Sequence, residues 1–190
     1  SLGKRVGGFG DAEVLSFHAT KVMNSFEGGA ILTNDDELAD RIKATRNFGF
    51  SEGDVRYAGT NGKMSEGAAA MGLTSLEHFH HFVEVNKRNY AAYSEHLHGL
   101  TGIQLLAYDP AEANNYQYVV LDIDPSAGVS RDQLLSILQA ENVLARRYFF
   151  PGCHRLEPYR TLFPDAPESL PNTEALAGRL LVLPTGTGVD

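Results

Sequence analysis

Cysteine, basic charge and long apolar runs are all scarce in this sequence. The only cysteine, Cys153, cannot form an internal disulfide, which fits a reducing cytoplasm. No run of about eighteen apolar residues occurs, so no membrane-spanning helix is expected. The net charge of −8 disfavours a nucleic-acid partner, because phosphates need a basic face. We therefore expect a cytoplasmic globular protein that binds neither a membrane nor a nucleic acid.

Two short apolar runs, residues 12–17 and 29–33, predict two strands of one sheet. The residues between these runs are mostly polar or glycine, which predicts a loop. Lys21 therefore lies on a loop that leaves the end of a strand. In open α/β sheets, ligands collect outside the carboxyl ends of strands.

Helical patterns and a long polar segment follow. Residues 34–46 predict a helix that Asn34 caps, with Glu37 three residues later. Residues 48–63 are rich in glycine and polar side chains and predict a loop. From Ser65 the pattern predicts one long helical stretch that runs to about residue 100.

The second half of the chain predicts a compact α/β layer. We expect strands at residues 103–107, 116–123 and 143–150, and helices at residues 130–140 and 172–181. Ser130 and Gln133 form the pattern of a capping box at the start of the first of these helices. A boundary near residue 100 would then divide the chain into residues 1–100 and 101–190.

Lys21 lies between a short apolar run and a paired glycine, the local setting in which a lysine can hold pyridoxal 5'-phosphate (PLP) as a Schiff base. Ser16, at the end of the preceding apolar run, can bring a hydroxyl to a phosphate oxygen while the amine reaches the aldehyde carbon. The alternative is a solvent-exposed loop lysine without chemistry, which is the ordinary state of this residue type.

Two further clusters allow a structural or a functional interpretation. Residues 77–81 hold three histidines and a glutamate, but adjacent helical residues point in different directions and no second ligand cluster follows. We therefore predict no metal site. Arg146 and Arg147 precede three aromatic residues, where arginines can hold a phosphate and stack on a base, or simply face water at the end of a strand.

Four blocks in the order of one known family cover essentially the whole chain. They lie at residues 9–35, 61–73, 150–159 and 170–184. The first contains Ser16, Lys21 and the Glu27-Gly28-Gly29-Ala30 run. Together the blocks resemble the DegT/StrS family of PLP-dependent nucleotide-sugar aminotransferases.

The resemblance implies a role for each matching residue. Lys21 falls on the catalytic Schiff-base lysine, and Ser16 on a serine that binds the cofactor phosphate. Asn61 falls where the family reaches across a homodimer interface to the partner subunit's cofactor. Lys63, which stands where many members carry an arginine, is a second candidate for that role and is assigned with His154 to the substrate.

The resemblance also implies the fold and the reaction. The fold would be the α/β PLP-dependent transferase fold type I, with the end of the large domain in residues 1–100 and most of the small C-terminal domain in residues 101–190. The chain would then be truncated at both ends, and the preceding half would supply an aspartate for the pyridine nitrogen of PLP.

The implied activity is transfer of an amino group, with L-glutamate as donor, to a nucleotide-linked 4-keto-6-deoxyhexose in deoxyaminosugar biosynthesis. The alternatives are a 3-keto-sugar aminotransferase, a PLP enzyme for elimination or decarboxylation, and a non-catalytic protein that binds or regulates.

Overall fold

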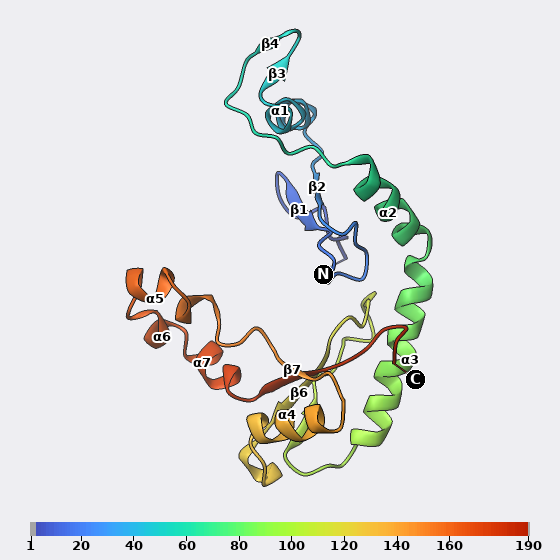
Figure 1. Cartoon of the computed structure of the whole chain (residues 1–190), viewed down its shortest axis with the longest axis vertical. Helices are drawn as coiled ribbons and strands as arrows, with labels where there is room; N and C mark the ends of the chain where they lie inside the picture. Colours follow the sequence, from blue (N-terminus) through green and yellow to red (C-terminus); the bar gives the residue numbers. More distant parts are fainter. Residues whose placement is uncertain (1–2, 190) are drawn as a thin grey trace. The chain divides into compact units, whose positions relative to one another are not determined.

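The computed structural model of the chain describes residues 3–189 (Figure 1). Its internal contacts divide the chain into two compact units, with the division between His81 and Phe82. The domain boundary near residue 100 concerns the whole protein and stays a prediction. Within residues 3–189, no helix combines the length and the apolar character needed to cross a membrane.

The first unit contains an antiparallel pair of strands, β1 (Glu13–Ser16) and β2 (Gly29–Leu32). The register pairs Ser16 with Gly29, so the segment that contains Lys21 connects two adjacent strand ends. A Cβ at Gly29 would lie 2.6 Å from the Leu15 carbonyl oxygen, so this position must be glycine for the strands to pair so closely. The strands predicted at residues 12–17 and 29–33 are confirmed.

Helix α1 (Asp36–Arg46) follows β2. The predicted helix is confirmed, but the predicted cap at Asn34 is wrong. The N-cap is Asp35, whose Oδ1 accepts the Leu38 N–H at 3.0 Å. Asn34 lies one position too early, since a capping side chain bonds the second or third amide of the helix.

The segment predicted as a loop at residues 48–63 contains a short hairpin, β3 (Phe50–Ser51) paired with β4 (Asp54–Val55). The two residues between these strands, Glu52 and Gly53, have φ values of 51° and 83°. Positive φ at both central residues is the geometry of a tight hairpin turn. The prediction missed it because Glu-Gly is not a common hairpin signal.

The predicted single helix at residues 65–100 is wrong. Helix α2 (Glu66–Glu77), capped by Ser65, ends at Glu77, and α3 (Phe79–Leu97) begins after the single non-helical residue His78. The His78 backbone leaves the helical conformation, with φ of −96° and ψ of 3°. Because periodicity continues across a break of one residue, the sequence pattern could not reveal it.

The second unit contains a four-stranded antiparallel sheet in the order β5-β6-β8-β7. The strands are β5 (Ile103–Leu105), β6 (Val119–Ile123), β7 (Arg146–Arg147) and β8 (Leu180–Leu183). Both faces of β6 are buried. Helix α4 (Arg131–Ala140) starts at the predicted capping box of Ser130 and Gln133.

The core of the second unit lies between this sheet and helices α3 and α4. The fully enclosed side chains Val119, Leu121 and Leu181 pack with Leu135 of α4 and with Tyr93 of α3. Short helices complete the unit: η1 (Pro125–Ala127), η2 (Cys153–Arg155), α5 (Tyr159–Leu162), α6 (Ala166–Ser169) and α7 (Pro171–Ala177).

Two predicted elements of the second unit differ from the structure. The strand predicted at residues 143–150 is reduced to Arg146–Arg147, because Phe149 has a φ of 43° and cannot continue a strand. The helix predicted at residues 172–181 ends at Ala177. Leu180–Leu183 is instead a strand buried at every position, and such an apolar run cannot be distinguished from a buried helix by periodicity.

Candidate active site

The segment that carries Lys21, residues 17–28 and here the lysine turn, is closed at its base by backbone hydrogen bonds. The Phe17 N–H donates to the Gly28 carbonyl oxygen at 2.8 Å, and the Ser25 N–H donates to the Phe17 carbonyl oxygen at 2.9 Å. The Lys21 N–H donates to the His18 carbonyl oxygen at 2.9 Å. These bonds fix the backbone of Lys21, whose side chain is half-buried.

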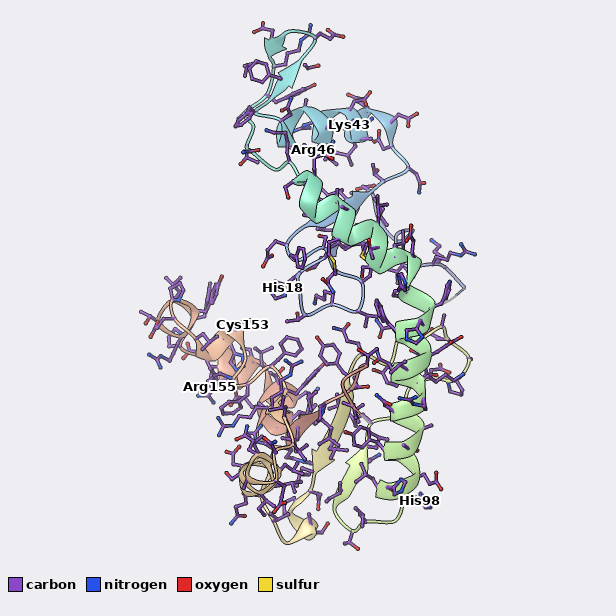
Figure 2. All side chains as sticks on the ribbon, turned by 45° about the vertical axis from the view of Figure 1, so that its right-hand side comes forward. His18, Lys43, Arg46, His98, Cys153 and Arg155 are labelled. Carbon is purple, nitrogen blue, oxygen red and sulfur yellow. The ribbon has the colours of Figure 1, made fainter. Side chains whose placement is uncertain are left out.

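The His18 side chain, labelled in Figure 2, contacts two polar groups of the same turn. Its Nδ1 lies 2.9 Å from the Thr20 hydroxyl, and its Nε2 lies 3.6 Å from Oε1 of Glu27. An imidazole, a hydroxyl and a carboxylate therefore lie within six residues of the lysine in sequence and on the same turn.

Ser16 is the last residue of β1 and is exposed. Its Oγ accepts the His18 N–H at 3.4 Å, which leaves the hydroxyl proton able to bond an external oxygen. Ser16 thus lies at the strand end from which the segment that contains Lys21 leaves β1. Their roles stay predictions.

Asn61 and Lys63 lie in the segment that leads into α2, and both are exposed. Asn61 forms an isolated antiparallel bridge with Asn47, just after α1. The Lys63 ammonium lies 3.9 Å from the centroid of the Phe48 ring, a cation–π contact. Both residues therefore belong to the first unit.

Met64 connects this segment to the lysine turn. A Cβ at Gly28, where φ is 152°, would lie 2.7 Å from the terminal methyl carbon of Met64 and equally close to the Ser25 hydroxyl. Gly28 therefore leaves the space in which the Met64 side chain contacts the base of the turn. Lys63, one of the predicted site residues of the first unit, directly precedes Met64 in the sequence.

His154 lies in η2 of the second unit, and its side chain is only 9% exposed. Its Nε2 lies 2.5 Å from Oε1 of Glu174 in α7, and the guanidinium of the neighbouring Arg155 also pairs with this carboxylate. The ring packs against Gly152, where a Cβ would lie 2.8 Å from its Cε1. Because His154 belongs to the second unit, its approach to Lys21 stays a prediction.

No role was predicted for Glu174, the third residue of this cluster. The Arg155 guanidinium, and secondarily His154, lower the pKa of its carboxyl to about 2. The same carboxylate raises the pKa of Arg155. Twenty residues separate Glu174 from His154, so no spacing pattern could have joined them.

The arginines that precede the aromatic run form a separate cluster. Arg147 donates to Oδ1 of Asp132 at 2.9 Å, and its guanidinium lies 5.1 Å from the centroid of the Phe150 ring. The buried Arg131 binds the same carboxylate and lies on the same ring, at 4.7 Å. These hydrogen bonds lower the pKa of Asp132, with Arg147 as the largest cause. The Arg147 side chain is therefore engaged within the protein.

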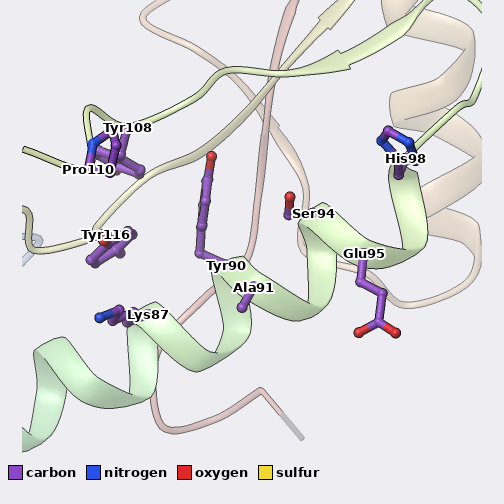
Figure 3. A pocket seen from close by; sticks show the side chains of 9 residues that line it. All are labelled: Lys87, Tyr90, Ala91, Ser94, Glu95, His98, Tyr108, Pro110 and Tyr116. Carbon is purple, nitrogen blue, oxygen red and sulfur yellow. The ribbon is translucent and has the colours of Figure 1, made fainter.

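A pocket of about 600 Å³ lies beside α3 in the second unit (Figure 3). Its aromatic wall consists of Tyr90, Tyr108 and Tyr116, whose ring centroids are 4.8 to 5.4 Å apart. The Tyr90 and Tyr108 hydroxyls donate to the backbone carbonyls of Leu106 and Tyr118. None of the predicted site residues lines this pocket. The Tyr90 and Tyr108 hydroxyls contribute to the packing of the unit.

Metal ligation has no support in the part of the chain that the structure describes. Within residues 3–189, no group of three or more histidine, cysteine, aspartate or glutamate side chains could hold a metal ion. The histidines of residues 77–81 lie around the break between α2 and α3.

Comparisons with known proteins point to one family. A relative from Shigella dysenteriae, named dTDP-4-amino-4,6-dideoxy-D-glucose transaminase, is 36% identical over 176 residues, which cover 92% of this chain and 47% of the relative. A relative from Streptomyces venezuelae, named dTDP-3-amino-3,4,6-trideoxy-alpha-D-glucose transaminase, is 31% identical over 200 residues, which cover 99% and 48%.

Among solved structures, DesI in the presence of its TDP-sugar product matches with a TM-score of 0.89 and 54% identity, covering 99% of this chain and 48% of that chain. This likeness confirms the predicted α/β class of PLP-dependent transferase fold type I. The chain spans about half the length of the proteins it matches. The profile of the DegT/DnrJ/EryC1/StrS aminotransferase family matches residues 1–190, so the chain belongs to this family.

Proposed function

We propose that the complete protein is a PLP-dependent aminotransferase that transfers an amino group from L-glutamate to a nucleotide-linked 4-keto-6-deoxyhexose. The observation that carries the proposal is the position of Lys21, on a hydrogen-bonded turn between two paired strand ends. The family match supports the same proposal, because the whole length of the chain matches an aminotransferase family.

The residues of the lysine turn fit a phosphate-bearing aldehyde. Lys21 supplies the primary amine that can bind the aldehyde carbon, and Ser16 supplies a hydroxyl at the same strand end for the phosphate. When bound, PLP supplies an electron sink and a temporary acceptor for the amino group.

Lys21 would act twice in this reaction. Its amine would hold the cofactor in the resting protein. Once the amine is free, its Nζ would serve as general base and then as general acid, taking a proton from the substrate and returning it. Two half-reactions on one protein predict ping-pong kinetics.

Amination at C4 rather than C3 is supported by the more similar relatives. The relative named for a 4-amino sugar is 36% identical, and the relative named for a 3-amino sugar is 31% identical. The stretch from Phe149 to His154 also resembles members that act on 4-keto-6-deoxyhexoses. His154 and Lys63 are the proposed substrate contacts.

We also propose a cytoplasmic homodimer with shared active sites. Asn61 is exposed and can reach a neighbouring subunit's cofactor, and α2 exposes Leu73 and Leu76. Mixing two impaired variants tests this arrangement. Lys21→Ala and Asn61→Ala subunits should regain partial activity together, because one site of each mixed dimer would have both residues; no regain would contradict shared sites.

The visible absorbance of the complete protein tests the cofactor assignment. The wild-type protein should be yellow with PLP, and Lys21→Ala should lose the band while it stays folded. Lys43→Ala is the matched control, because Lys43 is an exposed lysine of the same unit that pairs only with Asp40. A colourless wild-type protein in the presence of PLP would contradict the proposal.

Product analysis tests the substrate. With L-glutamate and the 4-keto sugar nucleotide, we expect formation of the 4-amino sugar and an equal amount of 2-oxoglutarate. Preferential turnover of the 3-keto isomer would overturn the assignment to C4.

A further inference from the structure

A hydrogen bond attaches the lysine turn to helix α2. The Asn24 backbone N–H donates to the Ser75 hydroxyl oxygen at 3.2 Å, across 51 residues of sequence. Ser75 is 3% exposed, so water cannot readily replace this bond. Here the Ser75 hydroxyl accepts a hydrogen bond from another segment of the chain, so this bond lies outside the hydrogen bonding within α2.

Asn24 also reaches back to the lysine. Its side-chain Nδ2 donates to the Lys21 carbonyl oxygen at 3.2 Å. Two consecutive hydrogen bonds thus run from Ser75 of α2 through Asn24 to the main chain of Lys21. Each bond acts on the backbone, which determines the direction in which the Lys21 side chain leaves the turn.

The contact beside these bonds is close. A Cβ at Gly72 would lie 3.3 Å from the Ser25 Cβ, so the turn approaches α2 where the helix has no side chain. Ser25 is fully enclosed, and its hydroxyl donates to the Glu27 carbonyl oxygen.

The neighbouring Thr74 shows that this arrangement is specific to Ser75. The Thr74 hydroxyl donates to the Ala70 carbonyl oxygen of its own helix at 3.1 Å, the usual bond of a helical threonine. Ser75, one residue later, instead accepts from the lysine turn. The two hydroxyls therefore provide a matched pair for substitution.

We propose that Ser75 and Asn24 are positioning residues that set the direction of the Lys21 amine toward the cofactor, an inference that rests on the proposed function. Neither residue touches the reacting atoms. Both act through the backbone of Lys21, so their loss should change how the cofactor is held more than whether the protein folds.

Cofactor retention and visible circular dichroism of the complete protein test this proposal. Ser75→Ala and Asn24→Ala should each release PLP about 3- to 10-fold more readily, the effect of one lost hydrogen bond. Their circular dichroism per bound cofactor should also change, because that signal depends on the tilt of the chromophore. Thr74→Ala should match the wild-type protein in both readouts, and Ser75→Thr, which keeps the hydroxyl, should retain most of the wild-type signal.

The outcomes separate this inference from the proposed function. If the wild-type protein lacks the Lys21-dependent band, the proposed function fails. If that band is present but Ser75→Ala and Asn24→Ala both match Thr74→Ala, only the positioning role is overturned. Should Ser75→Ala fail to fold, Asn24→Ala decides alone, because Asn24 is on the turn and only half-buried.

Discussion

The lysine turn and the segment around His154, residues 152–155 and here the histidine segment, are held in place by different forces. Neutral hydrogen bonds, mostly from the backbone, close the turn and attach it to α2, and the pair of His18 and Glu27 lies on its exposed surface. A carboxylate shared by His154 and Arg155 holds the histidine segment. Neutral bonds change little with pH or salt, whereas exposed ion pairs are screened. The two predicted parts of the site should therefore respond differently to the same perturbations.

The largest expected effect is a loss of stability in the second unit that leaves the first unit much less affected. Leu181→Ala empties a fully enclosed position of the central sheet and should destabilise the second unit by about 2–5 kcal/mol. Hydrogen exchange in the complete protein should show faster exchange in β6 and β8, with the lysine turn much less affected. Leu144→Ala is the control, because Leu144 is 80% exposed. Equal loss of protection in both units would contradict this prediction.

A smaller effect is expected at the histidine segment itself. Gly152→Ala places a methyl group against the His154 ring at a φ of 96° and should cost about 1–3 kcal/mol. The melting temperature of the complete protein measures this change. Gly178→Ala should be neutral or slightly stabilising, since a Cβ there meets nothing within 4 Å and the backbone is right-handed helical. A Gly152→Ala protein as stable as Gly178→Ala would show that His154 is not packed against Gly152.

The Glu174 carboxylate makes the histidine segment sensitive to acid. Its pKa in the folded protein is lowered from 4.5 to about 2, so it stabilises the folded state fully above about pH 4.5 and loses this contribution as the pH falls toward 2. The difference in melting temperature between the wild-type protein and Glu174→Gln should therefore shrink over this range. It should also shrink in high salt, because the pair is partly exposed. A difference that does not depend on pH would contradict the ion pairing.

The smallest expected effect concerns Lys63 and Phe48. Lys63→Met removes a cation–π contact at an exposed site, which should cost no more than about 0.5–1 kcal/mol. Chemical denaturation measures this cost, and Lys63→Arg should retain it. If Lys63 also binds substrate, Lys63→Met should raise KM much more than it lowers stability. An unchanged KM would remove Lys63 from the proposed site.

The sequence predicted the parts of the fold that local patterns specify. The paired strands around Lys21 and the capping box of α4 are local, and both are confirmed. The helix break at His78 and the strand at Leu180–Leu183 were missed, because tertiary packing decides them. Periodicity cannot distinguish a buried strand from a buried helix in a short apolar run.

Residues of the candidate site, too, could be predicted only where a local pattern in the sequence identifies them. Ser16 and Lys21 lie near each other in sequence, so a motif could identify both. Ser75 and Glu174 act across 51 and 20 residues, and each forms its contact only after the chain has folded. Long-range partners of this kind leave no spacing signal in a single sequence.

The attachment of the cofactor to Lys21 can be tested most directly by mass spectrometry. The complete protein would be loaded with PLP, reduced with borohydride to make the lysine linkage permanent, and digested into peptides. We predict that the added mass of the reduced cofactor lies on Lys21. Its location on another lysine, or its absence from every lysine, would contradict the central claim.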